Sequence, residues 1–447
     1  MSDAANDLPL DETSRATLAA EGLHYELVDT DDADAHERWL QAYHRGFHSD
    51  ALTADQVHEY RAKLADPRLI GVWDGTAAEP EHPIATVGSW RSPLSLGNGD
   101  AVDAWAISLV SVASTHRRRG IARALIEGEL RSAHAAGLPL AMLTVSEATI
   151  YGRWGFGPAA YTADYRVDAR GLRVTTPLPA GRVHQVSAAA LRPLAPQLVD
   201  RASRQVAGEV PPRELNWDRI FALSTRTASQ AGKLRAARFD DAAGEAQGFV
   251  LYSVAEHATD FAAHTLTVEY LCAASDDALV ALWNFVLDQD LVATVVAPSR
   301  AVDEPWPWLV SNPRAVQTVG RSDHLWLRVL DVPTALIARR YAHADTVLLR
   351  VTDPLGFADG EWMLVTDSDG RATVTAANAA PSLGATGRGE PAVVDLGVEA
   401  LGALLLGGTP VSTLRLAGRV AEGSPGSAQR LDAVVRAPRA PFLSTWF

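Results

Sequence analysis

A run of three arginines and a glycine, residues 117–120, lies between an apolar strand and an alanine-rich helix. The strand is predicted over residues 104–112 and the helix over 118–136, because Gly137 ends the helical pattern. Such a helix start offers open N–H groups, a positive dipole end and forked guanidinium donors to an anion. Gly120 lets the backbone approach a ligand closely, since it has no Cβ. The stretch predicts a polyanionic phosphate site, with a solvated basic turn or a nucleic-acid patch as alternatives.

The phenol of Tyr151 follows the next predicted strand, at residues 140–145. A phenol has an ordinary pKa of about 10 and is protonated at neutral pH. It can therefore give its proton to a leaving group, which is the role of a general acid. The alternative is a core aromatic residue whose hydroxyl is satisfied by a neighbour.

The sequence ends in PFLSTWF, an apolar and aromatic segment. Chain ends usually fray unless something holds them, so we expect this segment to dock into a pocket with its α-carboxylate. A free α-carboxylate has a pKa of about 3.3–3.7 and is a weak base at neutral pH. Burial beside Phe442, Trp446 and Phe447 would raise that pKa and make the carboxylate of Phe447 a better base.

The composition is that of a globular protein, with 447 residues, 47% hydrophobic residues and 21% charged residues. The net charge of −14 argues against nucleic-acid binding and favours cationic substrates. No apolar run approaches the roughly 18–20 residues that span a bilayer, and no secretory signal is recognisable, so we expect a cytoplasmic protein. Cys272 is the only cysteine, which excludes an intramolecular disulfide, and we expect it to be a buried, inert thiol.

The predicted elements fall into three units after a flexible lead at residues 1–20. Residues 21–170 show the order βααβββαβ, and residues 181–331 repeat it after a linker near 170–180. In the repeat, Ala273 and Ser275 stand where the first unit has its arginine turn. A third unit, residues 332–447, begins with a helix and continues with alternating strands.

Two signatures make the chain resemble a known superfamily. Arg117, Gly120 and Ala122 match R/Q-x-x-G-x-G/A, the acetyl-CoA signature of the GNAT N-acetyltransferases. Tyr151 begins a match to a second signature of that superfamily, Y-x-x-x-G-F. With the strings THRRRG, SEATIYGRWGFGPA and DHLWLRVLDVPTALIARRYAH, and the aromatic last residue, the chain resembles the Eis-type (enhanced intracellular survival) acetyltransferases of actinobacteria over essentially its whole length. It departs from them at Ser114, where the family commonly has proline, and at Trp446.

The resemblance implies an α/β (α+β) fold with two tandem GNAT domains, of which the second lacks the cofactor motif. A sterol carrier protein-like domain would follow and supply the C-terminal carboxylate. The implied cosubstrate is acetyl-CoA, and no metal is expected. The general acid would be Tyr151 and the general base the carboxylate of Phe447. The implied acetyl-CoA-binding residues are Val110, Ser111, Val112, Arg118, Arg119, Gly120, Ile121, Ala122, Arg123, Ser146 and Glu147.

Residues after the first helix and in the central strands are expected to border the amine pocket, namely Phe47, Asp50, Trp90 and Leu109. His44 and His48 have the i,i+4 spacing of metal ligands but no evident third ligand.

The predicted function is transfer of acetyl from acetyl-CoA to primary amines of cationic substrates such as aminoglycosides, by direct attack. Protein lysines, arylalkylamines and polyamines are the alternative substrates. A non-catalytic lipid- or ligand-binding protein is the alternative from another class. The resemblance also implies a homo-oligomer, a hexamer built of two trimers.

Overall fold

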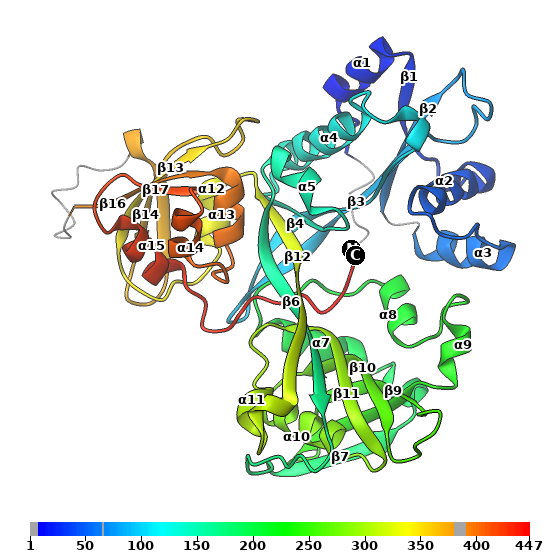
Figure 1. Ribbon diagram of the computed structural model, residues 1–447. Helices are drawn as coiled ribbons and strands as arrows, with labels where there is room; N and C mark the ends of the chain where they lie inside the picture. The colour runs from blue at the N-terminus through cyan, green and yellow to red at the C-terminus, as the bar shows by residue number, and fades with distance from the viewer. Residues whose placement is uncertain (1–7, 65–66, 380–389) are drawn as a thin grey trace.

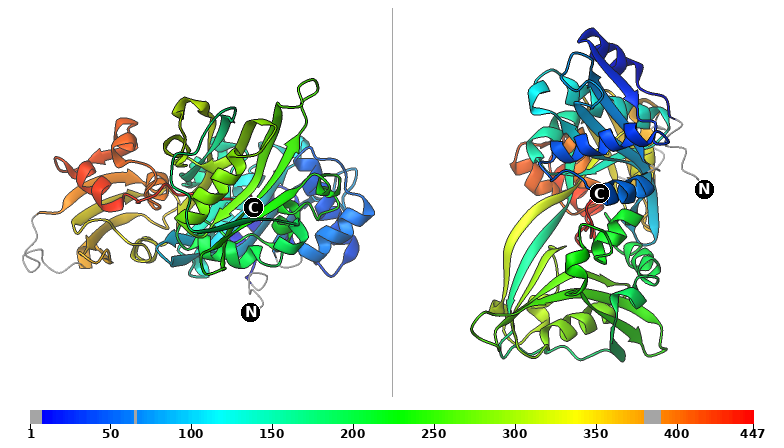
Figure 2. Two further views of the ribbon diagram at one scale, coloured as in Figure 1. Left: turned by 90° about the horizontal axis from the view of Figure 1, so that it is seen from below. Right: turned by 90° about the vertical axis from the view of Figure 1, so that its right-hand side faces the viewer.

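The computed structural model describes residues 8–64, 67–379 and 390–447. Their strands form two sheets, one of twelve strands and one of five (Figures 1 and 2). The twelve-stranded sheet runs through both GNAT-like units in the order β1-β2-β3-β4-β5-β12-β6-β11-β10-β9-β8-β7. The five-stranded sheet, in the order β15-β14-β13-β16-β17, belongs to the third unit, which lies beside the first one in Figure 1.

The first unit contains β1 (Leu23–Leu27), β2 (Arg68–Asp74), β3 (Ala85–Gly97), β4 (Asp100–Val112), β5 (Leu140–Thr144) and β6 (Gly157–Asp168), with helices α1 (Glu12–Ala20), α2 (Ala33–Gly46), α3 (Ala54–Lys63), α4 (Ile121–Ala135) and α5 (Ala148–Tyr151). The second contains β7 (Gly181–Val186), β8 (Arg235–Asp241), β9 (Ala246–Ala255), β10 (His264–Ala273), β11 (Val292–Ala301) and β12 (Val316–Val329), with α6 (Ala188–Leu191), α7 (Ala195–Ser203), α8 (Glu214–Ile220), α9 (Ala228–Ala231), α10 (Asp276–Leu287) and α11 (Trp306–Leu309). The third contains β13 (Thr346–Thr352), β14 (Gly360–Thr366), β15 (Ala372–Ala376), β16 (Ala392–Gly397) and β17 (Val420–Glu422), with α12 (Val332–Ile337), α13 (Val398–Leu404), α14 (Val411–Leu416) and α15 (Ser427–Val435).

Helix α1 corrects the expectation of a flexible lead. The side chain of Ser14 is buried and donates a hydrogen bond to the carbonyl of Ala124 in α4 (2.7 Å). Asp11 caps α1 and accepts two hydrogen bonds from Arg131 (2.9 and 2.8 Å), which fixes the helix to the first unit. Residues 1–7 lie outside the described part of the chain.

The parallel pair β4–β5 opens into a cleft. The two strands pair only from Ala104–Leu140 to Ala106–Met142, and beyond that point β5 keeps pairing with β12 on its other side. Strand β12, which falls inside the expected second unit, also pairs with β6, so the two units share one continuous sheet. Because β4 and β5 diverge at their carboxyl ends, the backbone of β4 is exposed to a ligand between them.

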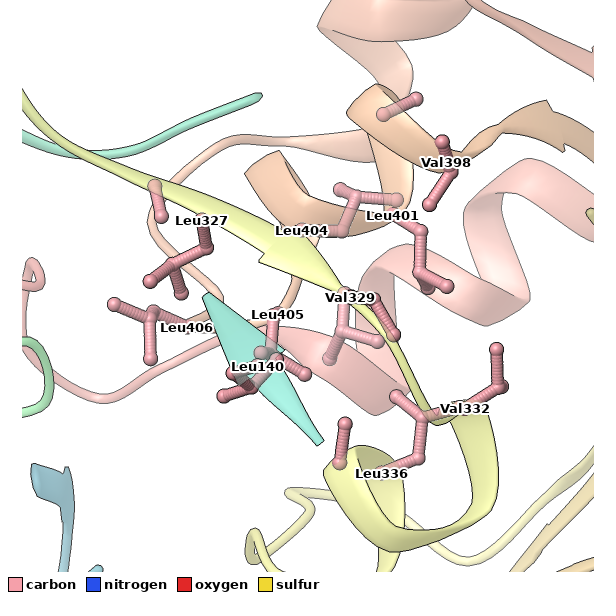
Figure 3. Packing of buried hydrophobic residues seen from close by; sticks show 14 of the residues in the cluster. Leu140, Leu327, Val329, Val332, Leu336, Val398, Leu401, Leu404, Leu405 and Leu406 are labelled. Atoms are coloured by element: carbon pink, nitrogen blue, oxygen red, sulfur yellow. The ribbon is translucent and has the colours of Figure 1, made fainter. Parts of the chain in front are cut away.

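The third unit docks on the first through an apolar core (Figure 3). Helix α13 packs against β6 and β12, and Leu405 and Leu406, directly after it, lie beside Leu140 of β5. The backbones of β6 and α13 approach each other closely: a Cβ on Gly157 would lie 1.8 Å from the carbonyl oxygen of Glu399. Arg328 and Asp353 form a fully buried ion pair beside this core (2.7 Å). The docking fixes the place from which the C-terminal segment starts.

Candidate active site

The arginine turn connects β4 to α4 and is open at the helix start. Gly120 caps α4 in a left-handed conformation (φ +77°), and the first intrahelical bond runs from Ala124 N to Gly120 O (3.0 Å). Nothing lies within 4 Å of a Cβ built on Gly120, so the residue is glycine because of its φ and not because of crowding. As at any helix start, the N–H groups of the first turn lack intrahelical acceptors and lie at the positive end of the helix dipole, which suits an anion.

The three arginines of this turn differ in their surroundings. Arg117 and Arg118 are exposed, whereas Arg119 is half-buried. Arg119 lies 3.7 Å from the carboxylate of Asp74 and donates to the carbonyl of Glu21 (3.0 Å). The guanidinium groups of Arg117 and Arg118 are thus the ones free to meet a phosphate.

Strand β4 contains a bulge where it enters the cleft. Its pairing with β3 shifts between Gly88–Ser108 and Thr86–Ser111, so Leu109 and Val110 oppose a single residue. Leu109 has φ +56°, a left-handed value that costs a non-glycine residue about 1–3 kcal/mol. Bulges of this kind are enriched next to active sites, because they re-aim backbone and side chains.

A cavity of about 240 Å³ lies at this bulge and is formed by both GNAT-like units and the C-terminal segment. It is lined by Tyr43, Phe47, Leu64, Trp90, Ile107, Ser108, Leu109, Val110, Thr144, Ser146, Tyr151, Arg213, Leu215, Asn216, Arg219, Trp446 and Phe447. Aromatic rings therefore form much of the wall, and the guanidinium groups of Arg213 and Arg219 lie on the side of α8.

Tyr151 reaches the cavity from the end of the short helix α5. Its ring packs edge-on against Phe156 with centroids 6.1 Å apart, and against Trp154 at 6.0 Å. Burial, reinforced by the nearby Glu147 carboxylate, raises the pKa of Tyr151 above its ordinary value. The phenol is therefore protonated throughout the neutral range.

The C-terminal segment crosses from the third unit to a place between the other two units (Figure 1), where Trp446 and Phe447 line the cavity. The main-chain oxygen of Phe447 accepts a hydrogen bond from the Thr144 hydroxyl (2.7 Å), at the end of β5. Its ring packs edge-on against Trp90 at 5.7 Å. The carbonyl of Trp446 accepts hydrogen bonds from Asn216 (2.8 Å) and Arg219 (3.3 Å) of α8. The last residue thus lies in the same cavity as Tyr151.

Seven of the seventeen site residues expected from the sequence line the cavity, and most of the others lie on β4, the arginine turn and α4. The cavity is lined by Tyr151, Phe447, Val110, Ser146, Phe47, Trp90 and Leu109. Ile121 is buried, Ala122 half-buried and Arg123 exposed on the first turn of α4, while Ser111 and Val112 are half-buried on β4. Glu147 is exposed at the N-cap of α5, and Asp50 is exposed and outside the cavity lining.

The residues that sequence reasoning missed come mainly from elsewhere in the chain. Thr144 lies in a segment that the motifs cover, but no sequence pattern indicated that its hydroxyl would take part in the site. Arg213, Asn216 and Arg219 belong to α8 and its start in the second unit, where no motif points to a site.

Two further expectations concern isolated residues. Cys272 is buried, as expected, and burial raises the pKa of its thiol. Burial lowers the pKa of His44 to about 4, with Arg226 adding to the effect, so its ring is neutral. Residues 8–64, 67–379 and 390–447 contain no group of three His, Cys, Asp or Glu placed to hold a metal ion. Within those ranges no helix is long and apolar enough to cross a bilayer.

Comparison with known proteins agrees with this geometry. Models of the acetyltransferase (GNAT) domain match residues 29–159 and 210–335, and a sterol carrier protein domain matches 332–444. An N-acetyltransferase of Streptomyces avermitilis is 31% identical over 92% of this chain and 96% of its own. The N-acetyltransferase Eis of Mycobacterium tuberculosis is 33% identical over 73% of this chain and 76% of its own.

Solved structures support the same assignment. Eis1 from Mycobacterium abscessus superposes with a TM-score of 0.80 at 29% identity, covering 95% of this chain and all of that one. A GCN5-related N-acetyltransferase from Kribbella flavida shares the fold, with a TM-score of 0.66 at 24% identity over 96% of this chain. The expected architecture of two GNAT domains and a sterol carrier protein-like domain is confirmed. The chain belongs to the Eis-type GNAT N-acetyltransferases, enzymes whose GNAT domain implies acetyl-CoA as cosubstrate.

Proposed function

We propose that this enzyme acetylates a primary amine by direct attack, with Tyr151 as general acid and the C-terminal carboxylate of Phe447 as general base. The observation that carries the proposal is that both groups line one cavity at the point where β4 and β5 diverge. A proton donor and a proton acceptor then face the same small space.

The atoms balance in a single addition and elimination. The amine nitrogen attacks the thioester carbonyl carbon, and the carboxylate of Phe447 takes the nitrogen's proton directly or through a water. The C–S bond then breaks, and the thiolate of coenzyme A takes the phenolic proton of Tyr151. An N–H at the β4 bulge, near Val110, is suited to polarise the thioester oxygen.

The arginine turn is the proposed seat of the pyrophosphate, with Val110 to Val112 beside the pantetheine arm. The open N–H groups at Gly120 to Arg123 and the exposed guanidinium of Arg118 support this placement. Ser146 and Glu147, which follow β5, complete the proposed acetyl-CoA site across the cleft.

Two observations bear on which amine is the substrate, and they favour different substrate classes. The net charge of −14 attracts polycations such as aminoglycosides towards the protein. The cavity itself is lined by the rings of Tyr43, Phe47 and Trp90 and by two guanidinium groups. A substrate with one amine on an aromatic body fits that lining better, because further ammonium groups would meet Arg213 and Arg219. We therefore place arylalkylamines before aminoglycosides, polyamines and protein lysines.

Release of free thiol from acetyl-CoA tests the proposal with an amine panel. We expect kcat/KM to be highest for an arylalkylamine such as phenethylamine, and lower for spermidine and an aminoglycoside. Arg219→Glu should shift the order towards the polycations, since it replaces a positive charge in the lining with a negative one. No turnover with any amine would contradict the enzymatic proposal, and an unchanged order in Arg219→Glu would contradict the electrostatic argument.

We propose a cytoplasmic homo-oligomer, a hexamer by family resemblance, and sedimentation equilibrium measures its mass directly.

A further inference from the structure

The second GNAT unit retains the divergence of two parallel strands that forms the proposed acetyl-CoA cleft in the first. Strands β10 and β11 pair in parallel only from His264–Val292 to Thr267–Val296 and then diverge, as β4 and β5 do. Strand β10 also carries a bulge, since its pairing with β9 shifts around Glu269. Helix α10 is the next element after β10 and begins three residues beyond its end, whereas the longer arginine turn separates β4 from α4.

This second cleft is unsuited to phosphates. Helix α10 begins with Asp276 and Asp277, whose negative charges lie where an anion would bind. The side chain of Ser275 caps the helix by accepting from the N–H of Ala278 (3.2 Å), which occupies one of the donors that a phosphate would use.

The C-terminal segment occupies the second cleft instead. A cavity of about 120 Å³ lies between Tyr270–Ala273 on β10 and Arg300–Pro305, and Phe442 and Ser444 contribute to its wall. Phe442 lies with its ring 5.5 Å from the guanidinium of Arg300, which is itself paired with Glu304 (2.8 Å). The segment therefore passes through the cleft of the second unit before it reaches the cleft of the first.

Ser444 is the anchor of this segment. Its N–H and hydroxyl both donate to Glu209 Oε2, at 3.1 and 3.0 Å. Its hydroxyl also lies 3.0 Å from the Tyr270 hydroxyl. Glu209 and Tyr270 are both buried, at 8% and 7% exposure, so these bonds compete with little water.

The anchor is tied to both units. The carbonyl of Glu209 accepts from Ser95 N at the end of β3 (2.9 Å), which joins the anchor to the first unit. One residue further along the tail, the carbonyl of Thr445 lies 2.9 Å from His324 Nε2 on β12. Phe447 is only three positions after Ser444, a span of about 10–11 Å in extended chain. A displacement of Ser444 therefore displaces Phe447 by a similar distance, because the short chain between them can absorb little of it.

We propose that the second GNAT unit uses its cleft as a clamp for the catalytic C-terminus, with Glu209 and Tyr270 as positioning residues for the Phe447 carboxylate. The inference rests on the proposed role of that carboxylate. It gives the cofactor-free unit a part in the reaction: it holds the base, while the first unit holds the thioester. Arg300 is the charged group that acts on Glu209. The Tyr270 and Cys272 side chains also interact with Glu209, and burial raises the pKa of both, which keeps them neutral.

Steady-state kinetics of Glu209→Gln, Tyr270→Phe and Ser444→Ala test the clamp. We expect kcat to fall by up to about 10²-fold, the loss typical of a displacement near 1 Å, with the acid limb of the pH–rate profile altered. The KM for acetyl-CoA should stay unchanged, because the arginine turn is untouched. Glu269→Gln is the matched control, since Glu269 is exposed on the same strand and accepts a hydrogen bond from the Ser253 hydroxyl on the neighbouring strand (2.6 Å).

A double-mutant cycle separates this inference from the function on which it rests. Each variant is combined with a chain extended by two alanines after Phe447. If the clamp acts through the tail, the double variant is no slower than the extended chain alone. Equal losses in the normal and extended chains, or wild-type kcat in all three variants, would overturn the clamp. An extended chain with full activity would instead overturn the carboxylate's role as the base.

Acetyl-CoA binding supplies a readout that is independent of turnover. Calorimetry should give one acetyl-CoA per chain, and two would show that the second cleft still binds the cosubstrate. If Glu209→Gln fails to fold by circular dichroism, Tyr270→Phe and Ser444→Ala decide the question, since each removes a single hydroxyl.

Discussion

Moving the C-terminal carboxylate by one residue is expected to remove most of the turnover and leave the fold intact. Deleting Phe447 transfers the carboxylate to Trp446, whose carbonyl bonds to Asn216 and Arg219 and not to Thr144. One extended residue spans about 3.3–3.6 Å, which exceeds the roughly 2.6–3.2 Å over which a general base must act. Loss of a general base costs about 10²–10⁴-fold in rate, equivalent to about 3–5.5 kcal/mol of barrier.

The chemistry and the packing of Phe447 are separable. Deletion also removes the ring that packs on Trp90, whereas two appended alanines keep the ring and displace only the carboxylate. Phe447→Leu keeps the carboxylate and an apolar side chain, so we expect less than about a tenfold loss. Thiol release over a range of pH measures kcat and the acid limb of kcat/KM, and calorimetry measures the melting temperature. An extended chain that keeps both kcat and the acid limb would refute the reasoning.

Three further predictions concern proton transfer, phosphate binding and stability. Tyr151→Phe should lower kcat by about 10²–10⁴-fold. Because burial raises the pKa of Tyr151, the activity of the wild-type enzyme should persist to high pH. Equal pH–rate profiles for the two proteins would leave the phenol without a catalytic role. Gly120→Asp should abolish tight acetyl-CoA binding in calorimetry, because it adds a negative charge and places a side chain at a backbone φ of +77°. An affinity equal to that of the wild-type enzyme would mean that the phosphates bind elsewhere. Burial raises the pKa of Glu209 from 4.5 to about 7. The neutral form of Glu209 therefore stabilises the fold at pH 4.5. This contribution to the free energy of unfolding, about 3 kcal/mol, is lost as the pH rises through 7. Glu209→Gln should therefore flatten the pH dependence of the free energy of unfolding between pH 4.5 and 7, as urea titrations would measure, and an equally steep dependence would contradict the assignment.

The sequence by itself determined the parts that depend on local spacing. The arginine turn, Gly120 and the tyrosine motif each occupy a few consecutive residues next to a strand, so their relation to the backbone follows from the secondary structure. The order of elements from β1 to β6 and from β7 to β11 was likewise readable, because alternating and helical patterns of apolar residues are local, whereas α1 and β12 were not predicted. Together these features gave the fold and the reaction class.

Only the tertiary structure decided which distant residues meet. Thr144 and Phe447 are 303 positions apart and share a hydrogen bond, and Ser444 and Glu209 are 235 apart. No local pattern encodes such contacts, since they arise from packing α13 against the shared sheet, which sets where the tail begins. Arg219 lines the cavity from α8, which packs against α3 of the first unit, whereas Asp50 lies outside the lining. The charge of the amine pocket is therefore a property of how the units assemble, because the residues that set it come from different units.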